Sequence, residues 1–433
     1  MAPLVYENAS FSPEVDLLAM ARHFFRLMLR NVASKGYIFT DPETGSASKP
    51  GCIIASPTYP DSLIPYGQIY VYNWTRDSAL TAIELASANP PLPQALADYV
   101  NFADACQNSG ASIGYACFTV DGKQRPGWSE QSDGPALQVS AILQFFARLA
   151  PPVQAMAKNV IAKNIDYLLG VYKTPTVNLW EETEGYSFFT RSVQLRCFRE
   201  YLNNTVGIPV VRSSDVKNAI TDLENALQSH WDPGRGHYLS VLNPQGPGAD
   251  LNADIIMASI YGAVPHTDSR MLASAAMLRS AFADSGSPWF YPVNGFDNGL
   301  GVGPLIGRYP DDTYDADDPE AKIHGHPWAP CSCNLAELYY KLAKDIATNN
   351  AMPFDALSSP LFSQVGINSG TPPDLAASLL RTAGDKILHA IIRHSDFLEL
   401  SEQFEADNGF EKSVHNLTWS YASFLSAIRA RQS

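Results

Sequence analysis

Twelve stretches with the apolar spacing of an amphipathic α-helix follow one another along this chain, with no strand pattern alternating between them. At the start of the first stretch, Ser12 is a suitable N-cap and Pro13 suits the first helical position. Its apolar residues recur on one face: Leu17, Ala21, Phe24, Met28 and Val32. We expect helices over residues 13–32, 76–88, 92–107, 133–149, 152–171, 187–203, 213–229, 252–263, 268–284, 332–347, 373–393 and 418–431. The pattern predicts an all-α fold.

Six long loops, rich in glycine and aromatic residues, separate some of these helices, whereas others are joined by short links such as Asn89 to Pro91. Short links favour antiparallel neighbours, and long irregular loops usually carry function. We therefore predict six helical hairpins closed into a ring, with the long loops gathered at one end. These loops span residues 35–74, 110–132, 172–186, 231–251, 285–328 and 394–417.

The length of 433 residues is typical of two or three domains, or of one large barrel. No linker rich in glycine, serine or proline divides the chain, and no accessory module is visible. We therefore expect a single domain over residues 1–433.

The charge and hydropathy of the chain exclude several classes of partner. A formal net charge of −14 argues against a nucleic-acid partner and gives no attraction to an anionic membrane. No run of 18 uncharged apolar residues is present, so no membrane-spanning helix is expected. The six scattered cysteines do not resemble a disulfide framework, and the N-terminus does not resemble a signal peptide. We expect free thiols and a cytoplasmic protein, or a secreted one if a leader has been removed, that binds a neutral ligand.

Dense clusters of charged and aromatic residues lie in the long loops, and five of the seven tryptophans belong to them. The clusters read YVYNWTRDSAL (70–80), RPGWSEQSDGPAL (125–137), NLWEETEGYSFFT (178–190), IGRYPDDTY (306–314), HGHPW (324–328), SEQFEADNG (401–409) and LTWSYASFL (417–425). A single tryptophan is often only a core residue. Rings beside carboxylates and arginines in so many loops favour a sugar site, because sugars need flat apolar faces and polar rims.

Two glutamates lie in different long loops, as glycoside hydrolysis requires. This reaction needs two carboxyl groups that approach the scissile bond from opposite sides, and these must come from different loops. Glu181 and Glu402 are 221 residues apart. Taken alone, each glutamate is most simply interpreted as a solvated loop residue. Glu182 cannot act in the same way as Glu181, because adjacent side chains point in different directions.

Together, the seven blocks resemble the glucoamylases of glycoside hydrolase family 15, in the order and at the spacing of that family, over about residues 52–427. The resemblance implies an (α/α)6 barrel, and no starch-binding module is visible beside it. It also implies an exo-acting enzyme that releases β-D-glucose from the non-reducing ends of α-glucans, with inversion. The chemistry needs neither metal nor cofactor, and we expect a monomer that binds an oligosaccharide or small α-glucoside.

The resemblance also implies a role for each matching residue. Glu181 resembles the general acid, and Glu402 resembles the general base that activates water. An inverting pair leaves about 6.5–9.5 Å between the carboxyl groups for that water. Glu182 resembles the neighbouring carboxylate that binds sugar hydroxyls. The residues that resemble the polar clamp on the terminal glucose are Arg76, Asp77 and Arg308. Trp128 resembles the tryptophan that lies over the acid. The residues that resemble the aromatic walls of the family's sugar site are Tyr70, Trp74, Trp180, Trp328 and Trp419.

Three departures from the family pattern are expected on the side of the leaving group. Asn178 stands where many fungal members have aspartate. The usual arginine after Trp128 is missing, and Glu130 adds a negative charge there. An insertion at 315–323 precedes HGHPW. These departures leave open a second hypothesis, that the same barrel acts on another α-glucoside or on a non-carbohydrate substrate in a specialised pathway.

Two further alternatives follow from the residues. A non-catalytic binding protein is disfavoured, because such a protein need not keep both Glu181 and Glu402. A zinc site is the other alternative, since four possible ligands lie within ten residues: His324, His326, Cys331 and Cys333. Their spacing matches no common zinc motif, so ordinary loop and helix residues are the preferred interpretation.

Overall fold

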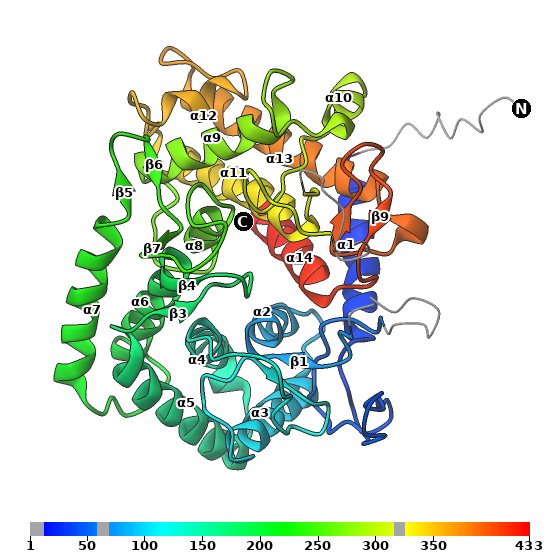
Figure 1. Ribbon diagram of the computed structural model, residues 1–433, viewed down its shortest axis with the longest axis vertical. Coiled ribbons are helices and arrows are strands. Elements are labelled where there is room, and N and C mark those ends of the chain that lie inside the picture. Colours follow the sequence, from blue (N-terminus) through cyan, green and yellow to red (C-terminus); the bar gives the residue numbers. More distant parts are fainter. Residues whose placement is uncertain (1–12, 59–68, 316–324) are drawn as a thin grey trace, which may run out of the picture.

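Six helices form a closed inner ring in the computed structural model, which describes residues 13–58, 69–315 and 325–433 (Figure 1). Each inner helix packs against the next, and the last packs against the first, which closes the ring. The inner helices are α2 (Thr75–Ala86), α4 (Asp133–Phe145), α6 (Phe188–Leu202), α8 (Asp254–Ile260), α11 (Ala329–Asn349) and α14 (Thr418–Gln432).

Six further helices pack around the outside, each against an inner partner. They are α1 (Pro13–Leu29), α3 (Pro93–Gln107), α5 (Pro151–Val171), α7 (Ser213–Gln228), α9 (Ser269–Ala283) and α13 (Pro373–Arg393). The predicted ring of six hairpins, an (α/α)6 barrel, is thereby confirmed. All twelve predicted helices are present.

The boundaries of some helices differ from the prediction. Helix α11 begins at Ala329 rather than 332, because Pro330 occupies its first turn, where a missing N–H costs nothing. The predicted helix over 133–149 ends at Phe145 and continues as the 3₁₀ turn η1 (Phe146–Arg148). Two short helices, α10 (Pro292–Gly299) and α12 (Ser359–Ser363), and the 3₁₀ turn η2 (Asp396–Leu398) were not predicted.

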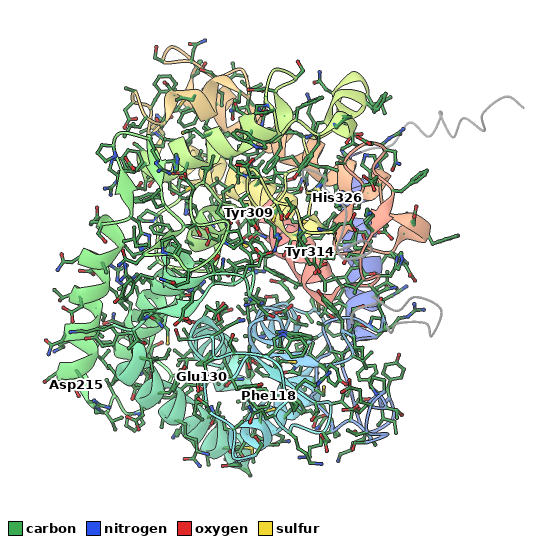
Figure 2. All side chains as sticks on the ribbon, viewed as in Figure 1. Phe118, Glu130, Asp215, Tyr309, Tyr314 and His326 are labelled. Atoms are coloured by element: carbon green, nitrogen blue, oxygen red, sulfur yellow. The ribbon has the colours of Figure 1, made fainter. Side chains whose placement is uncertain are left out.

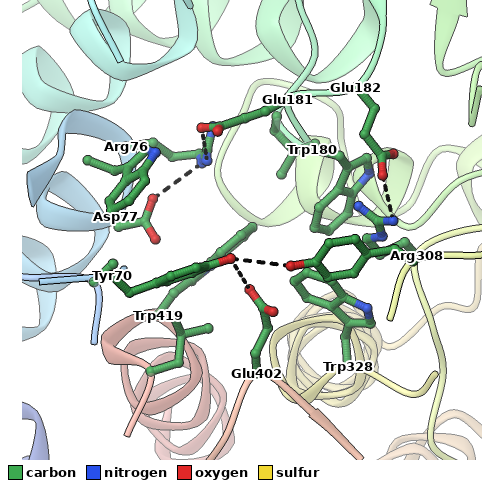
Figure 3. A pocket seen from close by; sticks show the side chains of 15 residues that line it. Tyr70, Arg76, Asp77, Trp180, Glu181, Glu182, Arg308, Trp328, Glu402 and Trp419 are labelled. Atoms are coloured by element: carbon green, nitrogen blue, oxygen red, sulfur yellow. Dashed lines mark hydrogen bonds and ion pairs between the residues drawn. The ribbon is translucent and has the colours of Figure 1, made fainter. Parts of the chain in front are cut away.

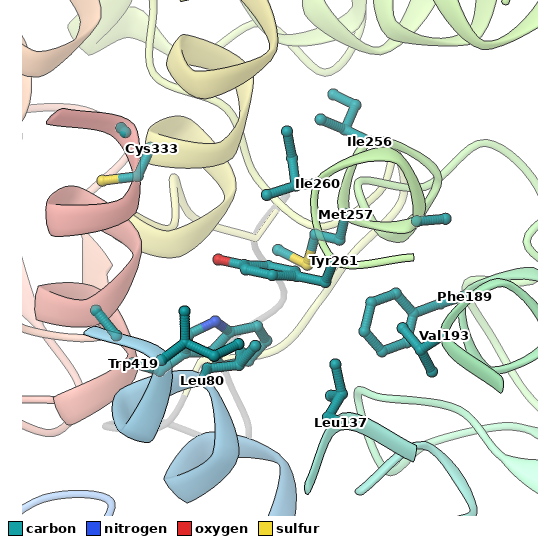
Figure 4. Close-up of a cluster of buried hydrophobic side chains, with 14 of the residues drawn as sticks. Leu80, Leu137, Phe189, Val193, Ile256, Met257, Ile260, Tyr261, Cys333 and Trp419 are labelled. Carbon is teal, nitrogen blue, oxygen red and sulfur yellow. The ribbon is translucent and has the colours of Figure 1, made fainter. Parts of the chain in front are cut away.

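Inner and outer helices differ in how they bury their side chains. Every residue of α2 is buried, whereas α7 buries only Val216, Ala219, Leu223 and Leu227. A helix in the middle of a protein has no solvent face, while a surface helix keeps a single apolar stripe. The inner helices fill the axis of the ring with side chains, among them Leu80, Leu137, Phe189, Met257, Cys333 and Trp419 (Figure 4). The centre of the barrel is therefore a packed core.

Short antiparallel strands stiffen the long loops. They are β1 (Asn73–Trp74) with β2 (Cys117–Phe118), β3 (Thr176–Val177) with β4 (Glu184–Ser187) and β7 (Val241–Leu242), β5 (Trp231–Asp232) with β6 (His237–Tyr238), and β8 (Gln403–Phe404) with β9 (Glu411–Lys412). The pairing of Thr176 with Gly185 brackets the turn that carries Glu181. The β8–β9 hairpin begins directly after Glu402. Both expected catalytic loops are thus held at their bases.

The six cysteines all lie in the described part of the chain and are buried, unpaired thiols, as expected. Within the same residues, no helix combines the length and the apolar character needed to cross a membrane.

Candidate active site

A pocket of about 290 Å³ opens where the long loops meet the N-terminal ends of the inner helices (Figure 3). This volume is near the lower end of the range for small-molecule sites. Eleven of the twelve site residues expected from the sequence line it. The lining is Ala55, Tyr70, Trp74, Arg76, Asp77, Leu179, Trp180, Glu181, Glu182, Arg308, Tyr314, Trp328, Glu402, Leu417 and Trp419.

Glu181 sits in a tight turn with a left-handed backbone, at a φ of 65°. This conformation is uncommon outside glycine and is often found at functional sites. The buried Asn178 holds the turn: its side-chain Oδ1 accepts hydrogen bonds from the backbone N–H groups of Glu182 (3.1 Å) and Thr183 (3.2 Å). Its carbonyl oxygen accepts the N–H of Glu181 at 3.0 Å. The turn therefore sends Glu181 and Glu182 to different parts of the pocket.

Trp128 lies behind Glu181 rather than in the pocket wall. Its indole N–H donates to Glu181 Oε2 at 2.7 Å. The other carboxylate oxygen, Oε1, lies 3.7 Å from the Arg76 guanidinium and has no hydrogen-bond partner among the described residues. Trp128 thus holds one oxygen of Glu181 by a hydrogen bond, while the other oxygen accepts no hydrogen bond from the described residues.

Glu402 enters the pocket from the opposite side (Figure 3). Its side chain is buried, with 4% of its surface exposed. Oε2 accepts a hydrogen bond of 2.5 Å from the Ser413 hydroxyl, and Oε1 accepts a longer one, 3.4 Å, from the Tyr70 hydroxyl. Burial raises the pKa of Glu402 to about 7, and the hydrogen bond from Ser413 and the charge of Arg308 oppose this rise.

Arg308 is buried, with 2% of its surface exposed, and is held by two carboxylates. Asp312 accepts from its Nε at 2.8 Å and from its Nη2 at 2.7 Å, and Glu182 accepts from Nη2 at 2.7 Å. Burial disfavours the charged form, but Asp312 and Glu182 outweigh this and hold the pKa of Arg308 well above its ordinary value. Burial raises the pKa of Glu182, and Arg308 opposes that rise. Arg308 and Glu182 form a rigid, charged edge of the pocket.

Arg76 and Asp77 form a second charged edge at the start of α2. Arg76 Nη1 donates to Gln131 at 2.7 Å and to Asp133 at 3.2 Å. Burial raises the pKa of Asp77 to about 6, and the charge of Arg76 opposes this rise. Asp77 Oδ2 has no hydrogen-bond partner among the described residues.

Aromatic rings form the apolar walls between these charged edges. Trp180 lies centrally, with its ring centroid 5.4 Å from that of Trp328 and 5.9 Å from that of Trp419. Tyr70 packs against Trp74 with 5.5 Å between the centroids. The Trp180 N–H donates to Asn252, but the indole N–H groups of Trp328 and Trp419 lack partners in the described residues.

The combination of features in this pocket fits a polyhydroxyl ligand. Flat rings suit the C–H faces of a sugar, whereas carboxylates and guanidinium groups suit its hydroxyls. Buried polar atoms are normally hydrogen-bonded. Asp77 Oδ2 and Glu181 Oε1 lie 3.5 and 3.7 Å from the Arg76 guanidinium but accept no hydrogen bond among the described residues, so hydroxyl groups of a ligand would satisfy them and the indole N–H groups.

Several functional contacts were missed from the sequence. Tyr309 donates to Glu182 Oε2 at 2.8 Å, and Tyr314 lines the pocket, with its hydroxyl 3.4 Å from that of Tyr70. Both tyrosines belong to the quoted block GRYPDDTY, so a signal was available for them. Ser413 carries no such signal, because its role depends on the β8–β9 hairpin returning beside Glu402.

Two departures from the family pattern lie away from the pocket surface, contrary to expectation. Asn178 is buried beneath the acid turn and does not line the pocket. Glu130 is exposed, and it accepts a hydrogen bond from Tyr167 at 3.1 Å. Figure 2 shows Glu130 apart from Tyr309 and Tyr314, which lie near the centre of the ring. Residues 316–323 of the insertion lie outside the described residues.

The four residues weighed as zinc ligands have other surroundings where they are described. His326 is buried, and its Nε2 lies 3.1 Å from Asp315 Oδ2. Cys331 and Cys333 are buried in α11, and His324 lies outside the described residues. Across residues 13–58, 69–315 and 325–433, no three His, Cys, Asp or Glu side chains are grouped as metal ligands.

Comparison with known proteins places this geometry in a family. A family model described as "Glycosyl hydrolases family 15" matches residues 25–429. The chain is 28% identical to a probable glucoamylase of Schizosaccharomyces pombe, in an alignment covering 94% of this chain and 89% of that protein. It is 26% identical to glucoamylase GLA1 of Saccharomycopsis fibuligera, over 93% of this chain and 87% of the relative.

Solved glucoamylase structures share the fold. The glucoamylase from Hypocrea jecorina superimposes with a TM-score of 0.80 at 24% identity, covering 97% of this chain and 72% of that one. The glucoamylase from Saccharomycopsis fibuligera gives a TM-score of 0.77 at 23% identity, covering 99% and 97%. Because the family match extends over nearly the whole sequence, this chain belongs to glycosyl hydrolases family 15.

Proposed function

We propose that the protein is a glucoamylase-type hydrolase, which removes glucose from the non-reducing ends of α-glucans with inversion of configuration. The observation that carries this proposal is the placement of Glu181 and Glu402 on opposite sides of one pocket lined by rings and charged groups (Figure 3). In this scheme Glu181 is the general acid and Glu402 is the general base.

As general acid, Glu181 gives its proton to the glycosidic oxygen as the bond breaks. Trp128 holds one carboxylate oxygen and so fixes the orientation of the acid. Arg76 lies beside the other oxygen, 3.7 Å away, and favours the carboxylate that remains after the proton has left. Both contacts would therefore be strongest in the transition state, where they accelerate the reaction.

As general base, Glu402 removes a proton from a water molecule that attacks the sugar from the opposite face. Two hydroxyl groups, of Ser413 and Tyr70, hold the carboxylate in place. The pKa of about 7 means that the free enzyme has an ionised base only towards neutral pH and above.

The two charged edges suit the hydroxyl groups of the terminal glucose. Arg308 is fixed by Asp312, so it needs no reorganisation when a sugar binds, and Glu182 beside it can accept from a hydroxyl. Arg76 and Asp77 contact hydroxyl groups in the same way on the opposite side of the glucose.

The test is to incubate the protein with maltose, maltooligosaccharides and 4-nitrophenyl α-glucoside, and to follow the first sugar released by NMR. The expected product is β-D-glucose. If the first product is α-D-glucose, the inverting scheme is wrong. If no substrate is hydrolysed although sugars bind, the protein is a binding protein.

Three variants separate the roles of the glutamates. Glu181→Gln should abolish maltose hydrolysis but retain part of the activity on 4-nitrophenyl α-glucoside, because nitrophenolate leaves without a proton. Glu402→Gln should lose both activities, since the water is not activated. Glu184→Gln is the matched control, because Glu184 is exposed in the same loop, and it should leave both rates unchanged.

The alternative of a different substrate gains no support from the described residues. Asn178 and Glu130, two of the departures that motivated it, do not line the pocket. The relatives reported above are named as glucoamylases, which supports an α-glucan substrate. We also propose that the protein acts as a monomer, which size-exclusion chromatography with light scattering would test.

A further inference from the structure

A second pocket, of about 470 Å³, lies among the helices on one side of the barrel and shares no residue with the sugar pocket. Its walls come from α9, α10, α11 and α13 and from the segment that follows α12. Figure 1 shows these elements together along one edge of the ring. The volume is within the range of small-molecule sites.

Three polar side chains in this pocket have atoms without partners. Tyr339, on α11, is completely buried, and its hydroxyl has no hydrogen-bond partner among the described residues. Arg279 Nε on α9 and Gln364 Oε1 also lack a hydrogen-bond partner among these residues. The Gln364 amide is not free to turn, because its Nε2 donates to the Ala276 carbonyl (2.8 Å) and to the Ser280 hydroxyl (2.9 Å). Its oxygen is therefore a fixed acceptor.

Charged groups around the pocket favour a negative ligand. Arg279 and Lys386 both line it, and neither has a carboxylate within ion-pair distance in the described part of the chain. The one acidic group in the lining, Asp284, is exposed, and so is Lys386, so water and salt screen both charges. Arg279 is half-buried, so its charge is screened less. Arg279 is close enough to Tyr339 to oppose the rise that burial causes in the pKa of that hydroxyl. An arginine without a carboxylate partner has the shape and charge that recognise an oxyanion.

We propose that this second pocket binds a small oxyanion that also carries hydroxyl groups, such as a sugar phosphate. Arg279 and Lys386 bind the oxyanion, the Tyr339 hydroxyl donates to it, and the Gln364 carbonyl oxygen accepts from a ligand hydroxyl. Apolar residues form the remaining wall: Val302, Pro304, Val365, Leu379 and Ala383. Aromatic rings of the kind that line the sugar pocket are few here, which disfavours a neutral sugar alone.

The test is isothermal titration of the full chain with glucose 6-phosphate, inorganic phosphate and glucose. Glucose 6-phosphate should bind, and inorganic phosphate should bind more weakly. Arg279→Gln should weaken both by about tenfold or more, because a charge-assisted contact is lost. Tyr339→Phe should weaken them several-fold without loss of stability, since the hydroxyl it removes has no partner in the protein.

Arg393→Gln is the matched control, because Arg393 is an exposed arginine on α13 that does not line the pocket. It should leave all affinities unchanged. Hydrolysis of maltose by Arg279→Gln should equal that of the wild type, which shows that the variant is folded. The binding assay does not depend on hydrolysis, so its outcome is separate from that of the proposed function.

Three results would each overturn the proposal. The first is that neither oxyanion binds the wild-type protein. The second is that Arg279→Gln binds glucose 6-phosphate as tightly as Arg393→Gln does. The third is that Arg279→Gln weakens glucose and glucose 6-phosphate equally, which would make the site one for neutral sugars.

Discussion

Replacing Ser413 with alanine should move the acid side of the pH profile to higher pH. The Ser413 hydroxyl donates to Glu402 Oε2 at 2.5 Å, and this hydrogen bond is the strongest influence that opposes the effect of burial on the pKa of Glu402. A hydrogen bond to a charged group contributes about 1.5–3 kcal/mol, and about 1.4 kcal/mol corresponds to one pH unit. The base must be ionised to act. The pH at which kcat/KM reaches half of its plateau should therefore rise by about one to two pH units.

The assay is kcat/KM on maltose from about pH 4 to pH 9, because this parameter reports the titration of groups in the free enzyme. Ser413→Gly is an informative companion. It also removes the hydroxyl, but glycine accepts the φ of 66° at this position without strain. Both variants should show the same pH shift, and the glycine variant should be the more stable of the two.

Ser420→Ala supplies the control for loss of a buried serine hydroxyl. Ser420 donates to the Ser401 carbonyl at 2.7 Å and not to the Glu402 carboxylate, so its removal should cost stability without moving the pH profile. The reasoning is refuted if Ser413→Ala keeps the wild-type pH profile, or if Ser420→Ala shifts it by the same amount.

Three further outcomes follow from the geometry. Glu402→Gln should raise the melting temperature at pH 8 but much less at pH 5. The folded-state pKa of Glu402 is raised to about 7, so the cost of its buried charge is absent below the unfolded-state value and complete above pH 7. The cost grows by about 2.5 kcal/mol between pH 5 and pH 8, and thermal melts at both pH values would measure it. Trp128→Phe keeps an aromatic, although smaller, ring and removes the donor to Glu181. It should lower kcat on maltose by about tenfold or more, and an unchanged kcat in steady-state assays would contradict this role. Asn178→Ala leaves two backbone N–H groups beneath the acid turn without their acceptor, among them that of Glu182. It should lower the free energy of unfolding by about 1–3 kcal/mol in urea titrations and lower kcat as well.

The helical architecture was predictable because its signal is local. A helix places residues three and four apart on the same face, so α7 shows its buried stripe of Val216, Ala219, Leu223 and Leu227 directly in the sequence. The short helix α12 was missed because five residues hold too few turns for a period to be recognised, and α10 was missed because its sequence, PVNGFDNG, holds two glycines and few apolar residues.

The identities of most pocket residues were also predictable, because each long loop carries its own cluster of rings and charges. Glu181 and Glu402 were selected from such clusters, and Arg308 by the resemblance to family 15. The structure brings all three to one pocket. The partners of those residues were not predictable from the same clusters. Ser413 meets Glu402 only because a hairpin folds back.

The sequence by itself determined the ring of helices, because helical periodicity is a property of neighbouring residues. It also determined the membership of the site, through the clusters in the loops and their resemblance to glycoside hydrolase family 15. Tertiary structure alone decided three other things. It placed Asn178 beneath the acid turn, and it gave burial and Ser413 opposite effects on the pKa of Glu402. It also brought Arg279, Tyr339 and Gln364 into a second pocket. The reason is physical. A hydrogen bond or a pKa depends on distances of a few ångströms between groups that the chain separates by tens or hundreds of residues, and only packing of the helices sets those distances.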